Sequence, residues 1–212
     1  MTRLSFNFDK GMINRFNTLV PETARSRTIR NYLLKEYQLP KDIKDLPVQL
    51  EGENEIYPFH FNSESIEKLE EIVQEAQKMG ISINKSIVLR DVLNKLIERY
   101  TLNSFPPRVM KRNTFKVDIG TVQDLDKYIP KKERSIIIED FILEEYEGPN
   151  VPGEVLRIRP AYNEDLSVSL EMAVFDKLEH YVIQTNTKGV TKAAIFRDAV
   201  NSLLTRLKSE KK

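Results

Sequence analysis

The chain contains an internal repeat that spans most of its length. When the 212-residue sequence is shifted by 109 positions, residues 3–40 align with residues 112–149 without a gap, and 12 of the 38 aligned pairs are identical. The same shift aligns residues 59–80 with residues 168–189, and the match continues to residue 201 after a deletion of two residues. A repeat at a fixed offset indicates that one structural unit occurs twice. The sequence therefore predicts two similar halves.

Each half holds two segments with the same local plan, a short strand followed by two helices. We call them modules A, B, A′ and B′, and they span residues 3–40, 56–101, 112–149 and 165–208. In module A, every second residue is apolar: Leu4, Phe6 and Phe8 alternate with the polar residues Arg3, Ser5 and Asn7. This alternation is typical of a strand with one buried face. Asp9 is expected to cap the first helix, and Ser26 the second.

A single module of this kind is too small to fold alone. One strand and two helices cannot bury a sufficient core, and a lone strand leaves both of its edges unpaired. Pairing A with B and A′ with B′ as antiparallel ribbons over four helices solves both problems. We therefore predict a mainly α fold with short β-ribbons, built as two intrachain pseudo-dimers. The predicted domains are 1–104 and 111–212, with a linker at 105–110 that contains Pro106 and Pro107.

The composition excludes several classes of protein. The chain has no Cys, so it has no disulfide, thiolate nucleophile or Cys-ligated metal site. Its longest apolar runs are four or five residues, which is too short for a membrane span, and its N-terminal sequence lacks the apolar region of a signal peptide. Neither a GxxxxGK[ST] nor a GxGxxG nor an HExxH motif is present, and the two histidines fall on different elements. We expect a cytoplasmic protein that is not an enzyme and needs no cofactor or metal.

The repeated strand–helix–helix plan, with an alternating strand and a capped second helix, resembles the ribbon-helix-helix family of DNA-binding proteins. The resemblance covers all four modules and is clearest in module A, where RLSFNFD precedes an amphipathic helix and RSRTIRNYLLKEY. It implies that a two-stranded ribbon enters the major groove of double-stranded DNA and that its outward side chains contact base edges. The implied base-contacting residues are Arg3, Ser5, Asn7, His60, Arg112, Thr114, Lys116, Ser167 and Ser169.

The resemblance also implies that the start of each second helix holds a DNA phosphate. Unpaired amides and the helix dipole favour an anion at such a helix start. A cation lies beside a hydroxyl or amide side chain at all four starts. The implied phosphate-contacting residues are Arg25, Ser26, Arg27, Asn84, Lys85, Arg134, Ser135, Thr191 and Lys192. Ordinary helix capping would explain the hydroxyl and amide side chains, but it does not predict a cation beside each of them.

Two features depart from this pattern. The outward positions of module B are Ile56, Pro58 and His60, and a proline cannot donate a backbone hydrogen bond. The second helix of A′ carries an acidic run of Glu139, Asp140, Glu144, Glu145 and Glu147. The net charge of +1 is also small for a DNA-binding protein, but it combines +4 over residues 1–40 and +3 over residues 166–212 with acidic segments between them.

The leading functional expectation is a sequence-specific DNA-binding protein that acts as a transcriptional repressor and occupies adjacent half-sites. Self-association of chains on adjacent operator sites is a further expectation. One alternative is an accessory DNA-binding protein of plasmid transfer or partition, which the same features would equally suit. A second alternative is a protein-interaction module that has lost DNA binding, which Pro58 and the acidic run favour.

Overall fold

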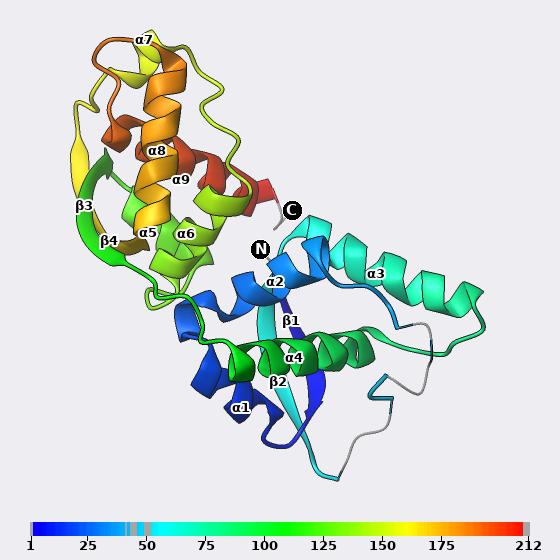
Figure 1. The fold of residues 1–212 in the computed structure, drawn as a ribbon. Helices are drawn as coiled ribbons and strands as arrows, with labels where there is room; N and C mark the ends of the chain where they lie inside the picture. Colours follow the sequence, from blue (N-terminus) through cyan, green and yellow to red (C-terminus); the bar gives the residue numbers. More distant parts are fainter. Residues whose placement is uncertain (1, 41, 43–45, 49–51, 210–212) are drawn as a thin grey trace. The chain divides into compact units, whose positions relative to one another are not determined.

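The structure is a computed structural model that describes residues 2–40, 42, 46–48 and 52–209. The chain divides into two compact units, Met1–Pro106 (unit 1) and Pro107–Lys212 (unit 2) (Figure 1). Each unit is mainly helical and contains one two-stranded antiparallel sheet. The predicted class, mainly α with short β-ribbons, is therefore confirmed.

The two units have matching element orders. Unit 1 contains β1 (Thr2–Asp9), α1 (Met12–Leu19), the short 3-10 helix η1 (Glu22–Ala24), α2 (Arg25–Lys35), β2 (Asn54–Phe61), α3 (Ser63–Lys78) and α4 (Lys85–Leu102). Unit 2 contains β3 (Met110–Asp118), α5 (Thr121–Tyr128), α6 (Arg134–Glu144), the one-turn helix α7 (Gly153–Leu156), β4 (Asn163–Glu171), α8 (Met172–Thr185) and α9 (Lys192–Ser209). None of the described helices is long and apolar enough to cross a membrane.

The strands pair within each half, as the sequence predicts. β1 runs antiparallel to β2, with Arg3 opposite His60 and Ser5 opposite Pro58. β3 runs antiparallel to β4, with Arg112 opposite Ser169 and Thr114 opposite Ser167. In Figure 1 the β3–β4 ribbon follows one side of unit 2, and the helices of the unit lie on its other side.

The inward face of each ribbon forms part of a hydrophobic core. In unit 1, Phe6, Phe8, Phe59 and Phe61 are all buried, and the rings of Phe8 and Phe59 meet edge to face at a centroid distance of 6.0 Å. In unit 2, smaller side chains take most of these positions, and Phe115 stacks on Phe196 of α9. Burying one phenylalanine contributes about 1.5–3 kcal/mol to stability, so these strand positions are major anchors of both cores.

The two modules of a unit interlock through their second helices. α2, from module A, packs against β2 of module B, and α4, from module B, packs against β1 of module A. Unit 2 repeats the arrangement, with α6 against β4 and α9 against β3. Each strand is therefore covered by a helix of the other module, so neither module completes its core alone.

The first helices begin differently from the prediction. Asp9 and its counterpart Asp118 end their strands and do not cap a helix; the residue before α1 is Gly11 at φ 86° and the residue before α5 is Gly120 at φ 89°. Only glycine adopts this left-handed conformation without a steric cost. In unit 1, a carboxylate from the paired strand supplies the cap, because Glu55 Oε1 accepts hydrogen bonds from the amides of Gly11 and Ile13, each at 3.2 Å.

A tyrosine and an aspartate connect the two modules at the same place in both units. The Tyr37 hydroxyl donates to Asp91 Oδ2 at 2.9 Å, and the Tyr146 hydroxyl donates to Asp198 Oδ2 at 2.7 Å. Burial, together with the adjacent carboxylate, raises the pKa of each tyrosine well above its ordinary value. Both tyrosines therefore remain protonated donors at any ordinary pH.

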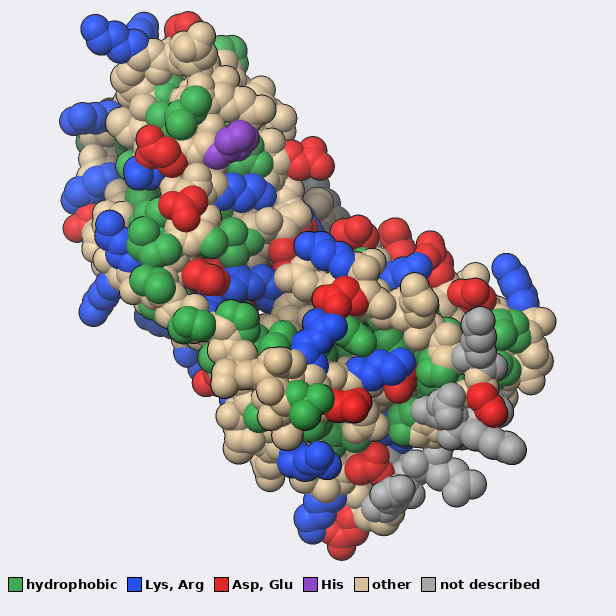
Figure 2. Space-filling view, in the orientation of Figure 1, with side chains coloured by type: hydrophobic (Ala, Val, Ile, Leu, Met, Phe, Trp, Pro, Cys, Tyr) green, Lys and Arg blue, Asp and Glu red, His purple; other side chains and the backbone are tan. Residues whose placement is uncertain are grey.

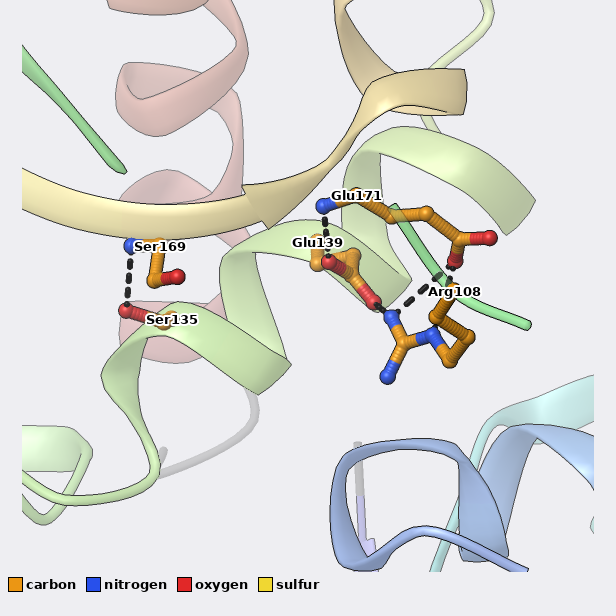
Figure 3. Close-up of polar contacts among 5 residues, drawn as sticks. All are labelled: Arg108, Ser135, Glu139, Ser169 and Glu171. Atoms are coloured by element: carbon orange, nitrogen blue, oxygen red, sulfur yellow. Dashed lines mark hydrogen bonds and ion pairs between the residues drawn. The ribbon is translucent and has the colours of Figure 1, made fainter. Parts of the chain in front are cut away.

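The segment 105–110, expected to be a linker, makes defined contacts at both of its ends. The Phe105 ring meets Tyr100 of unit 1 at a centroid distance of 5.1 Å. The Arg108 side chain is 6% exposed and forms ion pairs with Glu139 and Glu171 of unit 2 (Figure 3). The boundary between the units, at residues 106 and 107, lies inside this segment.

Candidate nucleic-acid interface

The outward faces of both ribbons carry the polar side chains that the alternation predicts. Every outward residue expected in modules A, A′ and B′ is exposed; these are Arg3, Ser5, Asn7, Arg112, Thr114, Lys116, Ser167 and Ser169. His60 is half-buried. The inward and outward parity of the strands is thus correctly predicted from the sequence. In Figure 2, Lys and Arg side chains project along the margin of unit 2 on which β3 and β4 lie in Figure 1.

The outward face of the unit 1 ribbon is polar on one strand and largely apolar on the other. Ile56, opposite Asn7, leaves 69% of its surface exposed, and Pro58 lies opposite Ser5. An apolar group on a strand that enters the major groove would contact a thymine methyl more readily than a hydrogen-bonding edge. On this ribbon, hydrogen-bonding side chains come mainly from β1.

The outward face of the unit 2 ribbon is polar on both strands. Thr114 and Ser167 share a hydrogen bond of 2.8 Å between their hydroxyl oxygens. Lys116 Nζ lies 2.5 Å from Asp165 Oδ1, and both side chains are largely exposed. Asp165 was missing from the expected set, although it has the same parity as Ser167 and the sequence could have revealed it. A carboxylate here can accept from cytosine N4 but repels a phosphate.

The second helices start at slightly different places from those expected. α2 begins at Arg25 and α6 at Arg134, so Ser26 and Ser135 lie inside the first turn and are not caps. The two remaining expectations are confirmed. Asn84 accepts from the amide of Ile87 at 3.1 Å, and Thr191 accepts from the amide of Ala194 at 3.3 Å.

Serines in the first turn of three second helices contact the ribbon. Ser26 Oγ accepts from the His60 amide at 3.1 Å, and Ser86 Oγ accepts from the Asn7 amide at 3.3 Å. Ser135 Oγ accepts from the Ser169 amide at 3.2 Å (Figure 3). Each amide belongs to an outward residue of the strand that the helix covers. The ribbon face and the helix starts, expected separately as base and phosphate contacts, therefore adjoin one another.

Ser86 was not among the expected site residues. Its position in the first turn of α4 equals that of Ser26 in α2, and this alignment of helix starts is the signal that would have identified it. The corresponding residue of α9 is Ala193, which has no hydroxyl. The fourth helix start therefore lacks the serine contact.

The expected phosphate-contacting cations fall into two groups. Arg25 and Arg134 turn toward the preceding helix: Arg25 donates to the carbonyls of Val20 and Asn17, and Arg134 pairs with Asp126 of α5. These contacts hold the two helices of a module together. Arg27 lies half-exposed in the first turn of α2.

The lysines at the other two helix starts remain near the surface. Lys85 pairs with Glu70 at 2.6 Å, and Lys192 pairs with Glu179 at 2.7 Å. Both lysines are only partly covered, and surface pairs of this kind contribute little to stability. A phosphate could therefore replace the glutamate as partner at small cost.

The acidic run of α6 is mostly inside the fold. Glu139 and Asp140 are buried, and Glu145 pairs with Arg206 of α9. Glu139 accepts from the Glu171 amide at 2.7 Å and pairs with Arg108. Glu139, Asp140 and Glu145 therefore do not form an exposed acidic face, whereas Glu147, which follows the end of α6, is exposed.

The contacts within the chain are the available guide to its function. The described residues contain no group of three or more His, Asp or Glu that could hold a metal ion. No protein-family model matches the chain, and neither a curated protein nor a solved structure shows significant similarity to it. Function must therefore be inferred from the contacts of this chain itself.

Proposed function

We propose that the protein binds double-stranded DNA through the outward faces of its two ribbons, as four ribbon-helix-helix modules arranged in two pseudo-dimers. The observation that carries the proposal is the contact between ribbon and helix start. At Asn7, His60 and Ser169, an outward strand residue adjoins the first turn of a helix through a serine hydroxyl. Base-edge contacts and phosphate contacts can then be made by one continuous surface.

The side chains on that surface suit the two tasks. Arg3 and Arg112 are exposed at equivalent positions, and a guanidinium pairs with the O6 and N7 acceptors of guanine. Asn7 suits adenine. Lys85 and Lys192 lie at helix starts whose amides favour an anion. The apolar Ile56 and the Lys116–Asp165 pair give the two ribbons different chemistry, so we expect the two half-sites to differ in sequence.

Among the roles open to such a protein, we propose repression of transcription by occupying an operator. Two linked domains raise the effective concentration of the second at its half-site, which suits stable occupancy. A role in plasmid transfer or partition would use the same interface. The position of the bound sequence, at a promoter or at a transfer or partition origin, distinguishes the two.

The test is selection of bound duplexes from a random pool, followed by titration of the selected site at several salt concentrations. We expect Arg3→Ala and Arg112→Ala each to cost about 1–3 kcal/mol and to relax specificity at a different base pair. Lys85→Ala and Lys192→Ala should instead weaken binding to all duplexes and reduce the salt slope by about one. Absence of binding at low salt would overturn the proposal.

A matched control is available within unit 1. Lys78 is an exposed lysine in the last turn of the 16-residue helix α3. This turn is the end of α3 that is farther along the sequence from β2. Lys78→Ala removes the same charge as Lys85→Ala, and we expect a much smaller loss of affinity. Equal losses in the two variants would show that net charge, and not the proposed helix start, determines binding.

A further inference from the structure

Unit 2 contains a cavity that adjoins the proposed DNA interface and extends beyond it. Its volume is about 730 Å³, and it lies between β3, the segment that follows α7, and the starts of α8 and α9. Small-molecule sites typically measure about 300–1,000 Å³. The cavity is therefore large enough for a compact organic ligand.

The charge of the lining is strongly unbalanced. The lining contains one acidic residue, Asp176, and six basic residues, namely Lys111, Lys116, Arg157, Arg159, Lys192 and Arg197. An anion would be strongly favoured over a cation in such a site, because its charge would be balanced by the lining.

The six cations are not equally available to a ligand. Arg197 donates to the carbonyls of Leu156 and Ile158, which fixes the segment after α7 at the rim of the cavity. Lys116 and Lys192 have surface carboxylate partners. Arg157 and Arg159 are exposed. Among the described residues, neither guanidinium has an ion-pair or hydrogen-bond partner. These two arginines are the groups that a bound anion would engage most readily.

The cavity also has an apolar side. Phe115, Met172 and Phe175 contribute to its lining, and the first two turns of α8 hold the latter two residues in place. Lys111 Nζ lies 5.3 Å from the centre of the Phe175 ring, so a cation and an aromatic ring meet in one wall. A purely inorganic anion would leave this side unused.

We propose that the cavity binds a small organic anion, in which a phosphate or carboxylate group engages Arg157 and Arg159 and a compact apolar part faces Phe175 and Met172. The start of α9 also contributes to the lining, at residues 191–194, and its backbone amides can donate to the anionic group of the ligand. Every lining residue lies between Lys111 and Arg197, so the site is formed by unit 2.

The site has a consequence that rests on the proposed DNA-binding function. Thr114, Lys116, Thr191 and Lys192 line the cavity and also belong to the expected DNA-contacting set. A bound anion would neutralise part of the charge on which phosphate contact depends. The ligand would therefore lower the affinity of unit 2 for DNA and act as an inducer.

The first experiment uses phenyl phosphate as the probe and needs no DNA. Amide shifts of the full-length protein are followed by NMR, with inorganic phosphate and phenol as the two half-probes. We expect saturable shifts centred on residues 157–159 and 191–194, and weaker binding of either half-probe. Shifts spread evenly over both units, or equal affinity for phenyl phosphate and inorganic phosphate, would overturn the proposal.

Variants then test the assigned residues. Arg157→Ala combined with Arg159→Ala should weaken phenyl phosphate binding at least about tenfold, because hydrogen bonds to charged groups are lost. Arg15→Ala combined with Lys78→Ala removes two exposed cations from unit 1 and serves as the matched control. Retained affinity in the arginine double variant, or an equal loss in the control, would overturn the assignment of the ligand's charged group.

The second experiment tests the inducer role and can fail separately. Saturating phenyl phosphate should lower the affinity for the selected duplex several-fold, and the effect should disappear in the Arg157→Ala, Arg159→Ala protein. An unchanged DNA affinity would overturn the inducer role while leaving the cavity assignment intact. A protein that binds no duplex would overturn the DNA proposal, whereas the NMR result without DNA would still decide the cavity.

Discussion

At one repeat position the two units bury opposite charges. Arg30 of α2 is 0% exposed and Glu139, its counterpart in α6, is 1% exposed. Arg30 Nη1 donates to the carbonyl of His60 at 2.6 Å, whereas Glu139 accepts from the amide of Glu171 and pairs with Arg108. A duplicated fold can therefore keep its shape while the charge at a buried position is inverted, provided that new partners come with the change.

The partner in unit 2 comes from outside the repeat alignment. Arg108 precedes β3, in the segment between the paired halves, and its side chain reaches Glu139 of α6 and Glu171 at the end of β4 (Figure 3). A buried charge without a partner is strongly unfavourable. Arg108 is thus part of the unit 2 fold, although its position in the sequence suggests a linker.

The largest expected effect comes from removing this partner. Arg108→Met should destabilise unit 2 by about 3–5 kcal/mol, because it breaks the buried ion pair between Arg108 and Glu139 by removing one partner. Hydrogen exchange of the full-length protein, read by mass spectrometry, reports the loss in unit 2 and leaves unit 1 as the internal reference. Adding Glu139→Gln should recover most of the loss, since the amide oxygen still accepts from the Glu171 amide. No recovery in the double variant would show that the charge is not the cause.

A smaller effect is expected at the matching position of unit 1. Arg30→Met should cost about 1–3 kcal/mol, because it removes this hydrogen-bond donor from the buried side of the His60 carbonyl. The same hydrogen-exchange measurement, now read in unit 1, gives the comparison. A loss of stability as large as that caused by Arg108→Met would mean that the sign of the buried charge does not determine how much each unit depends on it.

One contact, a hydrogen bond from a tyrosine to an aspartate, occurs in both units, and its removal should destabilise the two units by similar amounts. Tyr37→Phe and Tyr146→Phe each remove a hydroxyl donor to an aspartate, at a cost of about 1 kcal/mol. The loss at Tyr146 should be the larger of the two, because Asp91 Oδ2 also accepts from Lys95 at 2.8 Å. Chemical denaturation of the two variants measures both values, and Asp91 variants provide the control. A larger loss at Tyr37 would contradict the supporting role of Lys95.

The smallest expected effect concerns the helix start that lacks a serine. Ala193→Ser should place a hydroxyl near the amide of Lys116, by analogy with Ser86 and the amide of Asn7. The gain should be about 0.5–1 kcal/mol at most, since the site is partly exposed. Slower exchange of the Lys116 amide is the measurement, and Ala173→Ser, at an exposed position of α8, is the control. Unchanged exchange would show that the fourth helix start differs in geometry as well as in residue type.

Much of the fold could be predicted because it depends on periodic burial and on the repeat. Strand parity at Phe6 and Phe8, the pairing of strands within each half, and the caps at Asn84 and Thr191 all follow from local pattern. The caps of the first helices could not be predicted, since Glu55 reaches Gly11 from a strand more than forty residues away. Contacts of this kind depend on the tertiary fold and leave no local pattern.

The candidate interface was predictable in its outline and less so in its contacts. Exposure of Arg3 and Arg112 follows from alternation. The inward turn of Arg25 depends on where the carbonyls at the end of α1 lie, which no sequence pattern shows. The acidic run of α6 was misleading for the same reason, because the repeat aligns Glu139 with an arginine and hides the counter-charge in the next segment.

The crossing of the second helices has a consequence for how chains of this kind can associate. In unit 2, α6 covers β4 and α9 covers β3, and the connection between the modules passes through α7. If that connection were too short for β4 to return beside β3, each module would have to take its missing strand and helix from a second chain. The product would be a domain-swapped dimer with an unchanged core. Shortening the connector is therefore a direct route from a pseudo-dimer to a true one.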